Sequence, residues 1–249
     1  PTGDIGEPDP NYVSTPIGAD LTTLEDARAA IDGHGLRDRL PHSVTDFLDH
    51  AGPEQETPKS FPQNTYFLIN TLPDLAEAAV NAARDRGVDA YVLTTFLEGE
   101  SRDAGTFMAS LAREIQSSGR PFAPPCIVVS SGETTTLIRP EVTITGHGGP
   151  SQELAVGFAL AAAEVPGACM YSMDSEGTDG TSSAAGGITD SSSAARARTA
   201  QLDLRAHLRG HASTEALSEL GDVVITGNTG TNLCDLNVLF VPAAPQGAK

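Results

Sequence analysis

The sequence contains no tryptophan, few aromatic residues of any kind (5%) and only two lysines, Lys59 and Lys249. It also lacks positive charge, because 33 acidic side chains stand against 15 Lys and Arg and give a formal net charge of −18. A field of that sign repels nucleic acid and anionic lipid, so we expect neither as a partner. No apolar run approaches the length that spans a bilayer and no signal peptide is recognisable, which predicts a cytoplasmic protein.

Cysteine is scarce as well. Cys126, Cys169 and Cys234 are widely spaced and odd in number, which predicts buried free thiols in a reducing compartment. Neither they nor the six histidines follow a metal-ligand spacing, so a structural zinc site is not expected. In contrast, 25 glycines and 17 prolines indicate a chain with many connections around a core of Ala, Val, Leu and Ile.

Apolar strands alternate with amphipathic helices along the chain, a pattern that predicts an α/β fold with a mainly parallel sheet. The expected helices are residues 24–33, 42–50, 72–86, 105–118, 152–163, 194–200, 202–209 and 213–220. The expected strands are residues 64–70, 90–95, 126–130, 168–173, 223–226 and 236–241, with a β-like stretch at 136–145. Thr22 or Thr23 is expected to cap the first helix and Ser43 the second. Residues 1–20 are expected to be irregular.

Four polar loops follow predicted strands or precede predicted helices. They span residues 130–135, 146–152, 174–187 and 226–235. In open α/β sheets ligands bind beyond the carboxyl ends of strands, and helix N-termini hold phosphate. Each loop alone is equally compatible with an ordinary turn. Their close spacing in the sequence predicts one shared polar site, with backbone N–H groups of residues 148–151 and 227–231 facing an anion.

Motifs in these loops resemble a known family. In order they are Ser-Gly-Glu-Thr-Thr at 131–135, Gly-Gly-x-x-Gln-Glu at 148–153, Gly-Thr-Asp-Gly at 177–180 and Thr-Gly-x-Thr-Gly-Thr-Asn-x-x-Asp-Leu at 226–236. Together they resemble the C-terminal half of the class II glycerate 2-kinases, including the domain called MOFRL. Residues 97–102 resemble the family's LEGEAR motif, and residues 3–7 with 14–16 resemble a segment before it more loosely. An older family label is hydroxypyruvate reductase, but no dinucleotide-binding G-x-G-x-x-G follows a predicted strand here.

The resemblance implies a two-domain α/β enzyme that transfers the γ-phosphoryl group of ATP to the 2-hydroxyl of D-glycerate with Mg²⁺. Residues 1–120 would form the C-terminal part of a first, Rossmann-like domain, and residues 121–249 a MOFRL domain. The implied catalytic residues are Glu133, which would orient a substrate hydroxyl, and Asp179 and Asp235, which would order Mg²⁺. The implied substrate- and phosphate-binding residues are Ser131, Gly132, Thr134, Gly148, Gly149, Ser151, Gln152, Thr178, Gly227, Thr229, Gly230, Thr231 and Asn232.

Two departures from the family leave three hypotheses open. The family pattern Gly-Gly-Arg-Asn-Gln-Glu has an arginine thought to act on the transferring phosphoryl group, and here Pro150 stands in its place, followed by Ser151. The family's first half, with its proposed catalytic lysine, is not in this chain, and Lys59 lies in a connector. The chain is therefore one part of a glycerate kinase whose missing half is a second chain or was removed, a repurposed enzyme acting on a small hydroxy acid or polyol derivative, or a catalytically silent binding module.

Overall fold

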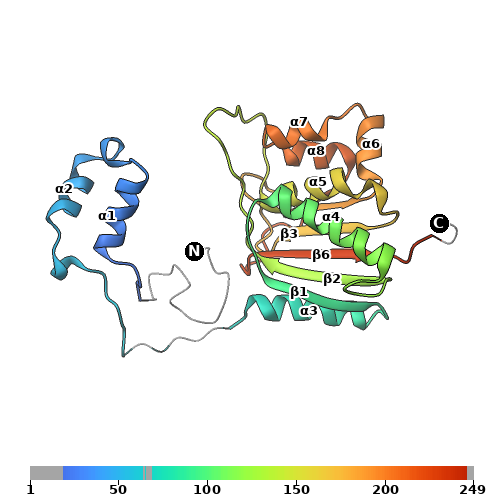
Figure 1. Ribbon diagram of the computed structural model, residues 1–249, viewed down its shortest axis with the longest axis horizontal. Coiled ribbons are helices and arrows are strands. Elements are labelled where there is room, and N and C mark those ends of the chain that lie inside the picture. Colours follow the sequence, from blue (N-terminus) through green and yellow to red (C-terminus); the bar gives the residue numbers. More distant parts are fainter. Residues whose placement is uncertain (1–18, 64, 66–68, 246–249) are drawn as a thin grey trace. The chain divides into compact units, whose positions relative to one another are not determined.

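The computed structural model describes residues 19–63, 65 and 69–245, and these fall into two compact units (Figure 1). The smaller unit contains the described residues up to 65, and the larger contains residues 69–245. The predicted strand at 64–70 lies mostly outside the described residues, as do the motif segments at 3–7 and 14–16. The predicted division at 120 and 121 falls between two paired strands of the larger unit, whereas the contacts divide the chain near residue 69.

The smaller unit is a helical hairpin of α1 (Leu24–Gly33) and α2 (His42–His50), with 3₁₀ turns η1 (Arg37–Arg39) and η2 (Pro53–Gln55). Thr23 caps α1 as predicted, because its side chain accepts from the Asp26 amide while the Asp26 carboxylate accepts from the Thr23 amide. The expectation that Ser43 caps α2 is wrong, since Pro41 holds the N-cap position. The Arg28 guanidinium ties the two helices together by donating to the Leu48 carbonyl at 2.8 Å.

The larger unit is built on one six-stranded sheet with the order β1-β2-β6-β3-β4-β5. Its strands are β1 (Asp89–Leu97), β2 (Cys126–Gly132), β3 (Cys169–Asp174), β4 (Gly186–Asp190), β5 (Val223–Val224) and β6 (Asp235–Val241). The α/β class is confirmed, but parallel pairing is confirmed only for β1 and β2, and the other four pairs are antiparallel. Two of these antiparallel pairs arise because β6, the last strand in the sequence, inserts between β2 and β3, and the other two join β4 to β3 and to β5.

Helices cover the sheet on both faces, as Figure 1 shows. They are α3 (Leu72–Arg84), α4 (Ser101–Ser118), α5 (Pro150–Ala161) with the turn η3 (Ala162–Glu164), α6 (Ser193–Thr199), α7 (Leu204–Arg209) and α8 (Ser213–Leu220). On one face, α3 packs on β1 and β2 through Val80 and Val129. On the other, α4 and α5 bury Met108 and Phe158 against β2, β3 and β6, while α6, α7 and α8 form a further layer on α5.

Two segments differ from their predicted secondary structure. Residues 136–145 form no strand, in keeping with Pro140 in their middle, which has no N–H to donate to a sheet. Strand β4 was not predicted, and it begins with Gly186 and Gly187, residues with low strand propensity. Within the described residues, no helix is long and apolar enough to cross a membrane.

Candidate functional site

The ends of three adjacent strands lie at one edge of the sheet. Gly132 at the end of β2 pairs with Asp235 at the start of β6, and Asp235 also pairs with Asp174 at the end of β3. The four polar loops extend from this edge and are joined by hydrogen bonds, among them the Ser175 amide to the Cys234 carbonyl at 2.9 Å. The structure therefore brings the four predicted loops together.

Asp235 lies at the centre of this cluster and is almost fully buried. One of its carboxylate oxygens accepts from the Ser151 hydroxyl at 3.1 Å, and the other from the Thr134 amide at 3.4 Å. Burial raises the pKa of Asp235 well above its ordinary value, and the nearby carboxylates of Asp179 and Asp174 raise it further. Acidic side chains thus gather at this edge of the sheet, in surroundings that disfavour their ionisation.

Asp179 performs a structural task that its position in a Gly-Thr-Asp-Gly motif did not reveal. Its carboxylate accepts from the Ser151 amide at 3.2 Å, the Gln152 amide at 2.9 Å and the Gln152 side-chain amide at 2.8 Å. The N-cap residue of α5 is Gly149, which has no side chain, so Asp179 caps α5 from another loop. Burial raises the pKa of Asp179 to about 6, although these hydrogen bonds oppose the rise.

This cap changes the expected role of the start of α5. The backbone N–H of Ser151, which was predicted to face a phosphate, and that of Gln152 are bonded to a carboxylate of the chain itself. The Gly148 amide donates to the Thr181 hydroxyl at 3.2 Å, and Pro150 has no N–H. An external anion would have to compete with Asp179 for this helix end.

The loop at residues 226–232 is the exposed part of the cluster. Gly227, Thr229, Gly230, Thr231 and Asn232 are all exposed, and both glycines have a positive φ that suits a glycine-rich loop. The Thr229 amide donates to the Glu176 backbone carbonyl at 3.0 Å, which fixes this loop against the loop that follows β3.

Glu176 joins the two loops with its side chain as well. One carboxylate oxygen accepts from the Thr178 hydroxyl at 3.2 Å, and the other accepts from the Asn232 side-chain amide at 3.2 Å. Glu176, which the sequence reasoning missed, thereby brings together Thr178 and Asn232, two predicted members of one site.

Two predicted site residues lie differently from the rest. The Ser131 side chain donates to the Leu72 carbonyl of α3 at 3.3 Å, so it contacts the helix on the other face of the sheet and not the carboxylates. Glu133 is half-buried, with a carboxylate oxygen 3.7 Å from the Cys234 sulfur. Glu133 thus contacts the residue that directly precedes Asp235.

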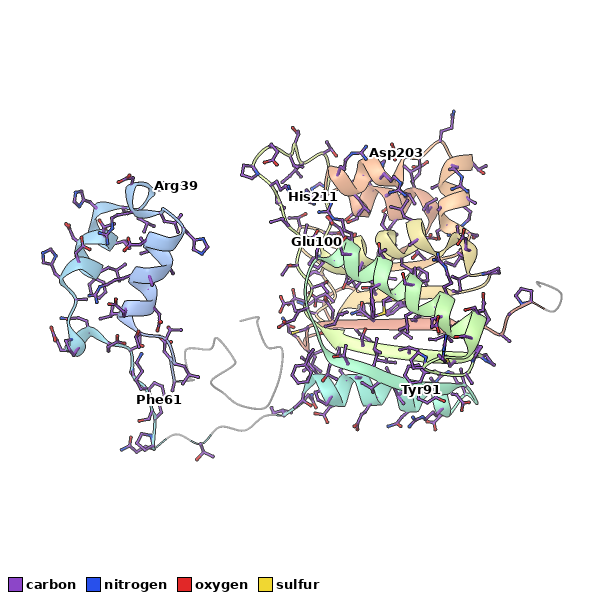
Figure 2. All side chains as sticks on the ribbon, viewed as in Figure 1. Arg39, Phe61, Tyr91, Glu100, Asp203 and His211 are labelled. Carbon is purple, nitrogen blue, oxygen red and sulfur yellow. The ribbon has the colours of Figure 1, made fainter. Side chains whose placement is uncertain are left out.

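Sequence reasoning also missed three residues beneath the site. Asp174 ends β3, and burial raises its pKa to about 6; its position directly after a predicted strand was a signal for it. Thr214 donates to the Gln152 side-chain carbonyl at 2.6 Å. His211, which is labelled in Figure 2, has its Nδ1 atom 2.8 Å from a carboxylate oxygen of Glu153. No local signal identifies His211 or Thr214, because they lie about sixty residues along the chain from their partners.

The cluster lacks a resident cation among the described residues, since Asp174, Asp179 and Asp235 make no ion pair there. The described part of the chain also contains no group of three or more His, Cys, Asp and Glu placed to hold a metal ion. The oxygens of Asp179 already accept three N–H donors, which leaves little capacity for a metal. Asp235 accepts only two donors and is the better placed of the two predicted Mg²⁺ ligands.

The sequence is similar to those of known proteins. Residues 126–235 match the model of the MOFRL family. The chain is 37% identical over 231 residues to glycerate 2-kinase of Pyrococcus horikoshii, covering 92% of this chain and 52% of that protein. It is 34% identical over 223 residues to D-glycerate 2-kinase of Thermotoga maritima, covering 90% and 51%. A putative hydroxypyruvate reductase of Agrobacterium vitis is 35% identical over 240 residues, 96% of this chain and 53% of that protein.

Solved structures agree with these matches. A crystal structure of a Thermotoga maritima glycerate kinase superposes with a TM-score of 0.72 at 34% identity, covering 89% of this chain and 51% of that one. The chain spans about half the length of the curated relatives it matches.

Proposed function

Because residues 126–235 match the MOFRL family and the chain is 37% and 34% identical to about half of two glycerate 2-kinases, we propose that it acts in ATP-dependent phosphoryl transfer to the 2-hydroxyl of D-glycerate or a related hydroxy acid. One observation carries the proposal: the four motif-bearing loops meet at one edge of the sheet around Asp235. Phosphoryl transfer requires mainly positioning and compensation of negative charge, and loops of this composition suit that task. We propose a cytoplasmic location, because the reaction consumes ATP.

We assign a role to each residue according to its exposure and its hydrogen bonds. The exposed loop at 226–232 is the part of the cluster open to the phosphates of ATP, because the amides at the start of α5 are bonded to Asp179. We assign Glu133 to orienting the acceptor hydroxyl and Asp179 to holding α5 in place. Asp235 would order Mg²⁺, which when bound offsets phosphate charge. Pro150 occupies the first position of α5, so the described residues offer no cation at that point to the transferring group.

One further part of the enzyme would supply both the cation that the cluster lacks and the remaining length of the relatives. This chain spans about half of each relative named above, so the proposal includes a further half of the fold, either a separate chain or a segment that was removed. That half would supply the basic side chains, and the protein would function as a hetero-oligomer when the half is a separate chain.

The test starts from the protein purified from its own source, whose native mass shows whether a second chain accompanies it. A partner of roughly two hundred residues is expected. The complex is incubated with Mg²⁺, ATP and D-glycerate, and the product is identified by phosphorus NMR. Phosphate on carbon 2 couples to one proton and phosphate on carbon 3 to two, so the splitting identifies the acceptor hydroxyl.

Matched variants connect activity to the site. Asp235→Asn is expected to abolish turnover while leaving the fold intact, since Asp235 is buried with a raised pKa and a neutral isostere fits there. Asp203→Asn, which makes the same substitution at the start of α7, is expected to retain turnover. A lone chain that binds ATP but phosphorylates only other acids would instead show a repurposed enzyme. A lone chain that binds no nucleotide would show a silent module.

A further inference from the structure

A second concave site lies on the outer helical layer. It is a cavity of about 350 Å³ between α6, α7 and the C-terminal end of α5. Its apolar wall consists of Leu160, Leu202, Leu204, Ala194 and Ala197. Since α5 rises about 1.5 Å per residue, Leu160 lies roughly 14 Å along the helix from the end that Asp179 caps. The cavity is therefore separate from the candidate site.

The segment that forms this cavity is positively charged, whereas the chain as a whole is negatively charged. Residues 193–212 contain four arginines and a single acidic residue, Asp203, in a chain of net charge −18. Arg198 and Arg205 line the cavity, and both are exposed. Within the described part of the chain, neither guanidinium makes a hydrogen bond or an ion pair, whereas Arg196 beside them binds Asp222 at 2.6 Å.

Within the described residues, the acidic residue at the cavity forms no ion pair with these arginines. The Asp203 carboxylate accepts from the Ala206 amide at 3.0 Å and so caps α7 (Figure 2). The turn between the helices holds Gln201 at a φ of 58°, a conformation that a residue other than glycine rarely adopts. The Gln201 amide donates to the Arg198 carbonyl at 3.1 Å, which fixes the turn between the two arginines.

We propose that this cavity binds a small organic carboxylate with an apolar body. The leucines and alanines of its wall favour an apolar body, and the two unpaired guanidinium groups at its rim favour an anionic head. The volume lies at the lower end of the range typical of small-molecule sites, about 300 to 1,000 Å³. The proposal does not depend on the kinase reaction, because it uses none of the residues assigned to it.

The test uses octanoate as the probe on the full chain, with binding measured by calorimetry and located by shifts of backbone amide NMR signals. Saturable binding is expected, with shifts concentrated at residues 194–205. Acetate lacks the apolar body and octanol lacks the charge, so both are expected to bind at least tenfold more weakly. Arg198→Ala and Arg205→Ala are each expected to weaken octanoate binding by about fivefold, as for an exposed charge pair of about 1 kcal/mol.

Arg209→Ala is the matched control, because Arg209 is exposed on the same helix as Arg205 but does not line the cavity. It is expected to change the affinity less than twofold. If Arg209→Ala weakened octanoate binding as much as the other two variants, octanoate would be attracted to the basic surface in general, and the proposal would be overturned. Octanol binding as tightly as octanoate, no saturable binding, or binding only of an acidic Leu-containing peptide would overturn it too.

Discussion

The Nδ1 atom of His211 lies 2.8 Å from Oε1 of Glu153, and both side chains are buried. Glu153 belongs to the first turn of α5 and His211 to the turn between α7 and α8, so the pair joins the outer helices to the helix beneath the candidate site. Burial raises the pKa of Glu153, and the hydrogen bond with His211 opposes that rise. Among the described residues, the other oxygen of Glu153 is buried without a partner.

We predict that His211→Ala lowers the free energy of unfolding by about 3 kcal/mol, because it leaves a buried carboxyl group without its partner. Urea denaturation followed by circular dichroism measures this, since the chain has no tryptophan to report unfolding. His207→Ala, at a partly exposed position of α7, is expected to change stability by about 0.5 kcal/mol or less. Adding Glu153→Gln to His211→Ala is expected to recover part of the loss, and strict additivity would contradict the pairing.

The stability of the larger unit is predicted to fall as the pH rises from about 5 to about 7. The folded-state pKa values of Asp174 and Asp179 are about 6, against an ordinary value of 3.8, so the folded state binds more protons in this window. Their contribution is complete below about pH 4 and is lost as the pH passes 6.

The variant Asp174→Asn tests this assignment. In the native protein the Glu176 amide donates to Oδ1 of Asp174 at 2.9 Å. The side-chain oxygen of asparagine still accepts this hydrogen bond, but asparagine does not titrate. The slope of the free energy of unfolding between about pH 5 and 7 is therefore expected to shrink. Asp85→Asn makes the same change of charge at the exposed end of α3 and is expected to leave the slope unchanged. Equal effects of both variants would assign the slope to overall charge.

Gly180→Ala is predicted to destabilise the protein more than Gly221→Ala. Both glycines have a positive φ, 60° and 72°, so each alanine costs about 1 kcal/mol or more in backbone strain. A Cβ at Gly180 would also clash with the backbone of Gly148 and Gly149, whereas a Cβ at Gly221 meets nothing within 4 Å. Thermal unfolding is expected to show an additional loss of about 2 kcal/mol for Gly180→Ala. Equal losses would mean that the two loops do not touch.

Pro150→Arg is predicted to raise phosphoryl transfer to glycerate by about tenfold or more in the complete enzyme. Pro150 is the first residue of α5, and an arginine there restores a cation beside the transferring group. Pro150→Ala removes the proline without adding charge and separates the two effects. Turnover in the phosphorus NMR assay checks the prediction, and a rate increase of the same size in both variants would refute the role of the charge.

Local sequence by itself determined the helices and the identity of the loops. Thr23 and Asp26 cap α1, and Thr71 and Asp74 cap α3, through hydrogen bonds that span only three residues. Such signals are complete within a short segment, so they can be recognised without knowledge of the fold. The four motif loops were recognisable for the same reason, because turn-forming glycines and polar side chains occur together in short stretches.

Only the tertiary structure decided the strand order and the chemistry at the start of α5. No local pattern places β6 between β2 and β3, because the pairing joins segments far apart in the chain and strand direction follows from packing. Asp179 looked like a ligand for a metal, yet it caps a helix that begins nearly thirty residues earlier. A carboxylate in a glycine loop accepts hydrogen bonds from whichever donors the fold brings near, and that choice is made in three dimensions.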